Sequence, residues 1–276
     1  MRKMSLNQDE EYLKNEQYQD SGNLNARAEL HRRFSSNKAG WHPWVLGQIG
    51  LKANSRVLEC GCGPGWLWRG QLDQLPPGCE ITLTDFSPGM VAEAEAALSS
   101  AGYRFHFETA DIQSLRFETD SFDVVVANHM LYHVPDRAKA LSEVRRVLRP
   151  GGRFVAATNG QDHMRELNEF SGILLGEEER RSLAQLRKQV SSAFSLENGQ
   201  EQLAPYFKEV TLMMYEDSLA VTEAAPLLAY AGSMMGGAAV LTAELKARAV
   251  EWIETEIQEK GAVHITKSSG LFIAHD

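Results

Sequence analysis

Residues 57–66 read VLECGCGPGW, a short apolar run followed at once by a glycine-rich turn. Glycines in such a turn let the backbone bend tightly and approach a ligand with no Cβ atom in the way. The Gly-x-Gly spacing is a weak signal by itself, because dinucleotide-binding enzymes use a similar loop. Glu59, directly before the first glycine, adds to the signal. A carboxylate at this position would repel a pyrophosphate on the following helix and attract a cationic ligand.

Two further acids stand where the next strand-like runs end. Asp85 ends the run Glu80–Asp85, and Asp111 follows residues 103–107, where aromatic and polar residues alternate. An acid at the end of the second strand can accept two hydrogen bonds from a ribose, and Asp111 could accept one from an adenine amino group. Acids at three consecutive strand ends therefore predict a nucleoside ligand that carries a positive charge and no phosphate.

Strand-like and helix-like segments alternate through the middle of the chain. The predicted strands are Arg56–Glu59, Glu80–Asp85, residues 103–108, Val124–Ala127 and Arg153–Thr158. Ser87 and Asp136 are N-cap signals for two of the helices between them, which we expect to end at Gly102 and at Pro150. Strands joined by such helices imply right-handed βαβ units. We therefore expect an α/β fold, with a parallel sheet covered by helices on both faces.

The segments outside this alternation have a mostly helical pattern. We expect residues 1–50 to form an N-terminal helical lid and residues 51–276 to form the main domain. Helical insertions at about 160–205 and 216–261 would form a cap over the carboxyl ends of the strands. Two late strands are expected at Glu209–Tyr215 and His264–Ala274.

The composition argues against several classes of protein. The 276 residues are 43% hydrophobic and 24% charged, which is typical of a globular protein with a sizeable core. There are 28 basic and 37 acidic residues, a net charge of −9, so binding to nucleic acid or to an anionic membrane mainly by charge is not expected. The sequence shows no apolar leader and three sparse cysteines, which indicates a reduced, cytoplasmic protein. Cys60 and Cys62 lack the partners of a zinc site, so no metal is expected.

Six blocks in this order resemble the class I S-adenosylmethionine-dependent methyltransferases, in particular the subgroup called methyltransferase type 11. The blocks are ECGCGPG at 59–65, DFSPGM at 85–90, ADI at 110–112, FDVVV at 122–126, NHMLYHVPD at 128–136 and LRPGGRF at 148–154. The resemblance covers residues 55–158. It implies a Rossmann-like, seven-stranded, mostly parallel sheet whose last strand is antiparallel. It also implies S-adenosyl-L-methionine as the cofactor and S-adenosyl-L-homocysteine as the product.

The resemblance also implies a role for each residue of the cofactor site. The glycine loop with Glu59 would lie along the methionine part, Asp85 would bind the ribose hydroxyls, and Asp111 would bind the adenine amino group. The backbone N–H of Ile112 would face a ring nitrogen, and the backbone carbonyl of Asn128 would meet the methionine ammonium. The full set of cofactor-binding residues is Glu59, Gly61, Cys62, Gly63, Asp85, Phe86, Met90, Asp111, Ile112 and Asn128.

The residues expected around the methyl acceptor lie after the fourth strand and near the N-terminus. His129 and His133 are the catalytic candidates, because a neutral imidazole can take a proton from a hydroxyl or an amine. The alternative is that both histidines only bind the backbone and shape the pocket. The polar and aromatic residues expected in the lid or against the substrate are Tyr18, Arg27, His31, Trp41 and Trp44.

The sequence thus predicts an enzyme that transfers a methyl group from S-adenosylmethionine to a small molecule under a helical cap. An RNA or protein methyltransferase is an alternative, but no basic cluster with interleaved aromatics accompanies the motifs. A nicotinamide-dependent oxidoreductase is a second alternative, which Glu59 disfavours, and a cofactor-binding protein without turnover is a third. We expect no nucleic-acid or membrane partner. The acceptor atom and the oligomeric state stay open, a homodimer included.

Overall fold

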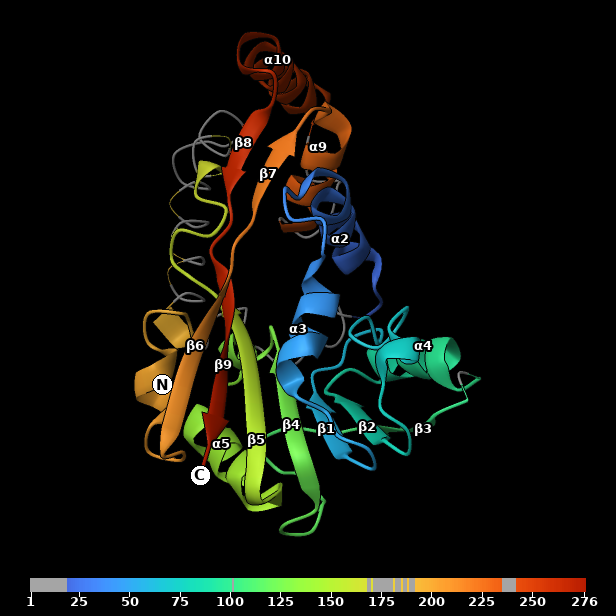
Figure 1. The fold of residues 1–276 in the computed structure, drawn as a ribbon. Helices are drawn as coiled ribbons and strands as arrows, with labels where there is room; N and C mark the ends of the chain where they lie inside the picture. Colours follow the sequence, from blue (N-terminus) through green and yellow to red (C-terminus); the bar gives the residue numbers. More distant parts are fainter. Residues whose placement is uncertain are drawn as a thin grey trace.

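The computed structural model describes residues 19–100, 102–167, 192–234 and 242–276, together with Phe170, Arg181, Gln185 and Lys188. Within these residues the centre is a seven-stranded sheet in the order β3-β2-β1-β4-β5-β9-β6 (Figure 1). Strands β1 to β5 are parallel, and β9 is antiparallel to both β5 and β6. The strands are β1 Arg56–Cys60, β2 Glu80–Asp85, β3 Arg104–Thr109, β4 Phe122–Asn128, β5 Leu148–Asn159, β6 Glu209–Tyr215 and β9 Ser269–His275. The predicted α/β sheet with an antiparallel last strand is confirmed.

Helices cover both faces of this sheet. Successive side chains of a strand point to opposite faces, and each face contributes to a separate hydrophobic cluster. One cluster joins Val57 and Val124 to helices α3 and α4, and the other joins Leu58 and Val125 to α5 and α8. Ser87 and Asp136 accept backbone hydrogen bonds at the starts of α4 and α5, as predicted. The helical elements of this layer are α3 Trp41–Ile49, η3 Leu72–Gln74, α4 Pro88–Leu98, η4 Leu131–His133, α5 Arg137–Val147 and α8 Gly199–Leu203.

Two predicted boundaries are wrong. Helix α4 ends at Leu98, not at Gly102. Strand β5 begins at Leu148, so that the Pro150-Gly151-Gly152 turn lies inside the strand. The reason is an irregularity in the pairing with β4: Phe122 pairs with Leu148 and Val124 with Arg153, so the extra residues bulge out of the ladder.

The predicted late strand His264–Ala274 is two strands, β8 Val263–Thr266 and β9, separated by Lys267 and Ser268. Strand β7, Ser218–Val221, pairs with β8 in a second, two-stranded sheet. The prediction that residues 216–261 are helical is therefore wrong at the start of that range. Figure 1 shows that β6 runs on towards β7 and that β8 runs down into β9, so the strand pair rises out of the main sheet.

The end of this strand pair carries three helices, α2 Gly22–Phe34, α9 Ala224–Met234 and α10 Ala243–Lys260. We call α2, α9, α10, β7 and β8 together the upper lobe. It has its own hydrophobic cluster, which includes Leu30 of α2, Leu219 of β7, Tyr230 of α9 and Ile253 of α10. The lobe lies beyond the carboxyl ends of the central parallel strands (Figure 1). In the part of the chain that the structure describes, no helix combines the length and apolar character needed to cross a bilayer.

Candidate functional site

The glycine turn after β1 is built around three glycines with positive φ: 71° at Gly61, 52° at Gly63 and 77° at Gly65. A Cβ atom on Gly65 would lie 2.8 Å from Cδ1 of Leu98, and one on Gly61 would lie 2.7 Å from Cγ of Met130. Above Gly63 the nearest atom to such a Cβ is Cδ1 of Leu24, at 4.0 Å. Gly65 therefore allows helix packing, whereas Gly63 is the least crowded of the three, so a ligand can approach its backbone most easily.

Asp85 ties the end of β2 to this turn. One carboxylate oxygen accepts the backbone N–H of Gly63 at 2.9 Å, and the other accepts that of Ser87 at 2.8 Å. Burial raises the pKa of Asp85, and the hydrogen bonds from Ser87 and Gly63 partly oppose this effect. The structure thus brings Asp85 and the glycine turn together as the sequence predicts, and fixes the carboxylate beside the uncrowded Gly63.

Asp111 lies at the neighbouring strand end. The backbone N–H of Ala110 donates to the backbone carbonyl of Asp85 at 3.0 Å, which keeps the two loops side by side. The Asp111 carboxylate accepts the backbone N–H of Gln113 at 2.8 Å and its side-chain amide at 3.1 Å. Ile112 and Met90 are buried beneath these loops. Asp111 is therefore held in a local turn, with an orientation set by Gln113.

Glu59 is almost fully buried and accepts the indole N–H of Trp68 at 2.6 Å. Burial raises its pKa to about 8, so most of the Glu59 side chains are protonated at pH 7 without a ligand. Burial thus disfavours, without a ligand, the negative charge that the sequence predicts for Glu59. A cation brought close would lower the pKa again. Burial also raises the pKa of Cys60 to about 12 and that of Cys62, so both remain unreactive thiols.

The turn after β4 places His129 in an unusual position. Its φ is +57°, and its backbone N–H donates to Ala157 of β5 at 3.1 Å. The ring Nδ1 is buried and has no hydrogen-bond partner among the described residues. Burial lowers the pKa of His129 to about 3, so the ring is uncharged at neutral pH. Such a combination of backbone strain and an unpaired nitrogen is typical of functional sites.

His133 lies one turn further on, in η4. Its backbone N–H donates to Met130 at 2.9 Å, and its ring makes an edge contact with Tyr132, with the centroids 4.6 Å apart. The catalytic role predicted for His133 is not tested by these contacts.

Trp41 and Trp44 of α3 lie against the same turn. The indole N–H of Trp41 donates to the side-chain oxygen of Asn128 at 3.2 Å, and its ring centroid is 4.9 Å from that of His129. Tyr215 at the end of β6 packs on both tryptophans, at 5.3 and 5.1 Å. The N-terminal segment therefore covers the end of β4 with aromatic rings.

The other predicted lid residues have separate positions. His31 of α2 faces His163 and Tyr230, with ring centroids 6.4 and 6.0 Å away. Arg27 is bound to the hydroxyl of Ser233 at 3.1 Å and to its carbonyl at 2.9 Å, so it ties α2 to α9. Tyr18 lies outside the described residues.

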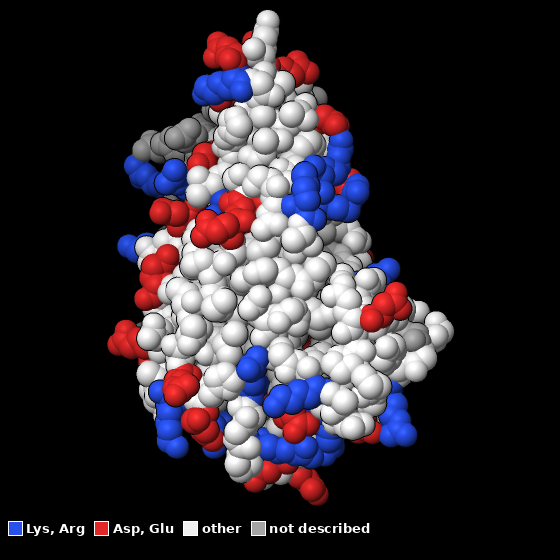
Figure 2. Space-filling view, in the orientation of Figure 1, with Lys and Arg blue, Asp and Glu red and all other residues white. Residues whose placement is uncertain are grey.

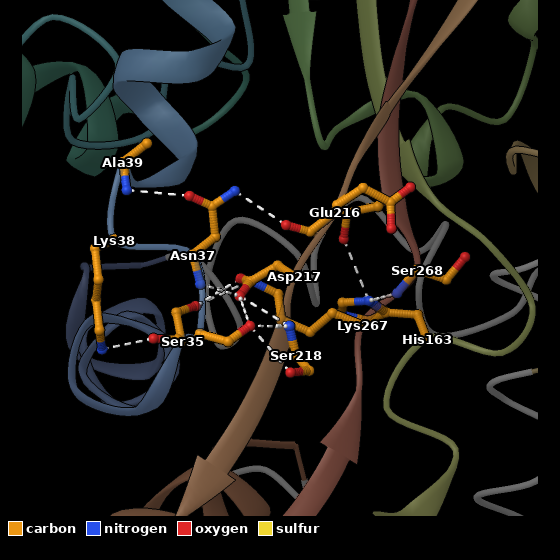
Figure 3. A network of polar contacts seen from close by, with 12 residues as sticks. Ser35, Asn37, Lys38, Ala39, His163, Glu216, Asp217, Ser218, Lys267 and Ser268 are labelled. Carbon is orange, nitrogen blue, oxygen red and sulfur yellow. Dashed lines mark hydrogen bonds and ion pairs between the residues drawn. The ribbon is translucent and has the colours of Figure 1, made fainter.

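A polar network connects the main sheet to the upper lobe (Figure 3). The sequence alone does not predict it. Lys267 and Asp217 form an ion pair between the ends of the two sheets, with 8% and 0% of their side chains exposed. Asp217 also accepts from the hydroxyl of Ser35 at 2.6 Å and from the backbone N–H of Asn37 at 2.9 Å. Burial acts to raise the pKa of Asp217, but the hydrogen bonds from Lys267 and Ser35 lower it to about 2.

His163 is a further polar residue near this network that the sequence alone does not predict. Its Nδ1 accepts the backbone N–H of Ser268 at 3.3 Å, as Figure 3 shows. Burial lowers the pKa of His163 to about 3. The polar run from Thr266 to Ser269, in the middle of the predicted strand, is a sequence signal for a break at this point.

A hollow of about 620 Å³ lies on the outer surface between α2 and β7. Arg33, which lines it, is ion-paired with Glu223, and Arg32 is ion-paired with Glu29. On the face drawn in Figure 2, basic and acidic residues are interspersed around a largely uncharged central band. These paired charges do not make an obvious anion site.

Residues 58–156 match the protein family described as a methyltransferase domain. This chain contains a methyltransferase domain. The matched segment includes the glycine turn, Asp85, Asp111 and the turn after β4. The match favours a methyltransferase over the nicotinamide-dependent oxidoreductase considered from the sequence.

The methyltransferase domain is similar to several known proteins. It is 32% identical over 125 residues to malonyl-[acyl-carrier protein] O-methyltransferase of Enterobacter lignolyticus, covering 45% of this chain and 47% of the relative. It is 38% identical over 128 residues to the ubiquinone/menaquinone biosynthesis C-methyltransferase of Geobacter sulfurreducens, covering 46% and 47%. The chain thus matches only about half the length of these relatives.

The whole fold is similar to that of solved methyltransferases. Phosphoethanolamine N-methyltransferase 2 of Haemonchus contortus, solved with S-adenosyl-L-methionine, gives a TM-score of 0.61 at 20% identity, over 100% of this chain and 61% of that chain. A methyltransferase from an antibiotic biosynthesis pathway of Anabaena variabilis gives 0.59 at 15% identity, over 85% of this chain and 96% of that one. At these identities the likeness concerns the fold alone.

Proposed function

We propose that this chain transfers a methyl group from S-adenosylmethionine to a small molecule bound between the sheet and the upper lobe. The observation that carries the proposal is the Asp85 carboxylate, which accepts the N–H of Gly63 at the least crowded glycine of the turn. This arrangement fits a nucleoside with a cationic tail, because it offers exposed backbone and acid oxygens but no built phosphate site. The methyltransferase domain over residues 58–156 supports it.

The proposed roles follow the order of the strand ends. Gly61, Cys62 and Gly63 would lie along the methionine part of the cofactor, with Glu59 beneath them. Asp85 would bind the ribose hydroxyls, with Phe86 and Met90 near the adenine. Asp111 would bind the adenine amino group, and the backbone N–H of Ile112 would face a ring nitrogen. The carbonyl of Asn128 would bind the methionine ammonium.

When bound, S-adenosylmethionine would supply an activated methyl group on a sulfonium. The residues of the chain then have to orient the acceptor and exclude water, since alignment alone lowers a barrier of this kind by about 7–11 kcal/mol. Trp41 and Trp44 cover the end of β4, and the upper lobe would close over the acceptor as a cap. His129 and His133 are the candidates for taking up a proton.

A small-molecule acceptor is favoured because the groups beyond β4 are buried and half-buried aromatic and imidazole rings. Trp41 contacts both His129 and Tyr215 there, and these rings do not line an open basic track. A polynucleotide would need a positively charged surface along its backbone.

Ligand-induced stabilisation tests the proposed cofactor directly. Saturating S-adenosylhomocysteine should raise the melting temperature, because a ligand at 100 times its Kd adds about 2.7 kcal/mol of stability. NAD and NADP at the same concentration should leave it unchanged. A shift with NAD and none with S-adenosylhomocysteine would overturn the proposal.

A further inference from the structure

Three imidazoles from distant segments lie beyond the carboxyl ends of β4 and β5. His31 comes from α2, His129 directly follows β4, and His163 lies in the turn after β5. The ring centroids of His31 and His163 are 6.4 Å apart. His129 is linked to this pair through aromatic contacts. Its ring lies 4.9 Å from that of Trp41, which lies 5.3 Å from that of Tyr215. The ammonium of Lys267, next to the Ser268 that binds His163, is 5.5 Å from the Tyr215 ring. We call these three residues the imidazole cluster.

The hydrogen bonds of the cluster are incomplete. Because Nδ1 of His163 accepts the N–H of Ser268, an uncharged His163 carries its hydrogen on Nε2 and can donate it. The Nδ1 atoms of His31 and His129 are buried without a hydrogen-bond partner among the described residues. Buried polar atoms are normally paired, so these two nitrogens indicate hydrogen-bonding positions that a ligand can fill. The described residues contain no cluster of side chains fit to hold a metal ion there.

The charges around the cluster disfavour a cationic acceptor. Burial lowers the pKa of all three rings, and the charge of Lys267, which is 8% exposed, lowers it further. Asp217, the acid that acts on His31 and His163, is already paired with Lys267 and fully buried. An ammonium group placed at the cluster would therefore find the charge of Asp217 already balanced by that of Lys267.

Aromatic rings lie beside the imidazole cluster. Trp41 lies 4.9 Å from the His129 ring, and Trp44 lies 5.3 Å from Trp41. Tyr230, which is buried, lies edge-on to His31 at 6.0 Å. Aromatic walls of this kind bury a planar ring with little loss of conformational freedom.

We propose that the imidazole cluster is the acceptor-binding site and that the acceptor is an uncharged aromatic ring bearing a hydroxyl group. The inference rests on the proposed function, since it names the substrate class of that same site. The hydroxyl would hydrogen-bond to the unpaired Nδ1 of His129, next to Asn128, where the methyl group is expected. His31 and His163 would bind the other polar groups of the ring.

With these groups the atoms and charges of the methyl transfer balance. The hydroxyl oxygen forms a bond to the methyl carbon while the bond from that carbon to the sulfonium sulfur breaks, and sulfur keeps the electron pair. The hydroxyl proton becomes strongly acidic as the oxygen is alkylated, so the uncharged His129 can accept it. The products are an aryl methyl ether, a thioether and an imidazolium, which then releases its proton to water. The site carries one positive charge before and after the step.

The test uses the full chain with ¹⁵N-labelled histidine, saturated with S-adenosylhomocysteine. The probes are phenol, catechol and 2-naphthol, with benzylamine and 2-naphthylmethylamine as cationic counterparts of similar shape. At least one phenol should shift the ring resonances of His31, His129 and His163, each assigned by its own substitution. The resonance of His106, exposed on the far edge strand β3, should not move. The amines should cause no shift in the cluster.

Substitution separates binding of the acceptor from binding of the cofactor. His31→Gln should weaken phenol binding at least about tenfold and leave the affinity for S-adenosylhomocysteine unchanged. The matched control is His106→Gln, which should change neither. Labelled methyl groups from S-adenosylmethionine should appear as ethers of the phenols.

Two results would overturn the inference while the proposed function stands. One is binding of S-adenosylhomocysteine with no cluster shift by any of the phenols. The other is equal or stronger shifts with the amines, or methylation of the amines alone. If S-adenosylhomocysteine itself does not bind, the proposed function fails and the inference falls with it.

Discussion

Lys267 and Asp217 form a nearly buried ion pair at the point where the strands leave the main sheet for the upper lobe. Asp217 lies between β6 of the main sheet and β7 of the two-stranded sheet. Lys267 lies between β8 of the two-stranded sheet and β9 of the main sheet. Ser35 and Asn37, from the connection between α2 and α3, bind the same carboxylate. The pair therefore joins three chain segments on which the position of the lobe depends.

Removing one partner of this pair should be strongly destabilising, because the other charge stays buried. Asp217→Asn should lower the free energy of unfolding in urea by about 3–5 kcal/mol. The double variant Asp217→Asn with Lys267→Met should lose less than the sum of the two single variants. Single variants within about 1 kcal/mol of the unsubstituted chain would show that the pair contributes little.

Asp85→Ala should weaken binding of S-adenosylhomocysteine about 10- to 150-fold, measured by calorimetry. The expected loss is that of hydrogen bonds to a charged group, about 1.5–3 kcal/mol. Asp73→Ala, an exposed acid in η3, is the matched control and should bind normally. Unchanged affinity in a folded Asp85→Ala variant would remove this residue from the cofactor site.

His129 and His133 can be distinguished by turnover. His129→Asn should lower kcat by about 10²–10⁴-fold, because asparagine tolerates the positive φ but cannot take up a proton as imidazole does. His133→Asn should lose less than about tenfold, because no unpaired buried nitrogen marks that ring. The affinity for S-adenosylhomocysteine should stay constant in both variants. A larger loss in His133→Asn would assign the base to His133 instead.

Stability should fall as the pH drops below 6.5. Burial lowers the pKa of His31, His129 and His163 to about 3, so in this range the unfolded chain binds protons that the folded chain does not. Each ring then costs up to about 1.4 kcal/mol per pH unit. Glu59, whose pKa burial raises to about 8, acts oppositely and loses its stabilising proton as the pH rises.

Urea unfolding between pH 6.5 and 5 measures this dependence. His129→Asn should make the pH slope shallower by about one proton, and Glu59→Gln should make it steeper. His106→Gln, at an exposed position, should leave the slope as it is. Equal slopes in His129→Asn and the unsubstituted chain would contradict an uncharged His129 in the folded state.

The parts of the fold that the sequence predicts depend on neighbouring residues. The glycine turn, the caps Ser87 and Asp136 and the strand ends at Asp85 and Asn128 are each encoded within a few positions. The site around His163 is different, because Ser268 lies 105 positions away from it. Asp217 and Ser35 are 182 positions apart. Such contacts follow from how the strands pair, and no local pattern encodes them.

The contact between Arg27 and Ser233 joins residues 206 positions apart. Helix α2 can therefore pack against α9 only after α9 has been synthesised. During synthesis α2 leaves the ribosome before the strands of the main sheet, and its partners β7 and α9 follow only after β6. Until then Leu30 and Phe34, both buried in the finished lobe, lack the residues of β7 and α9 that complete their hydrophobic cluster. A nascent chain paused before residue 218 would therefore present these side chains to a chaperone, and its aggregation would depend on how long that pause lasts.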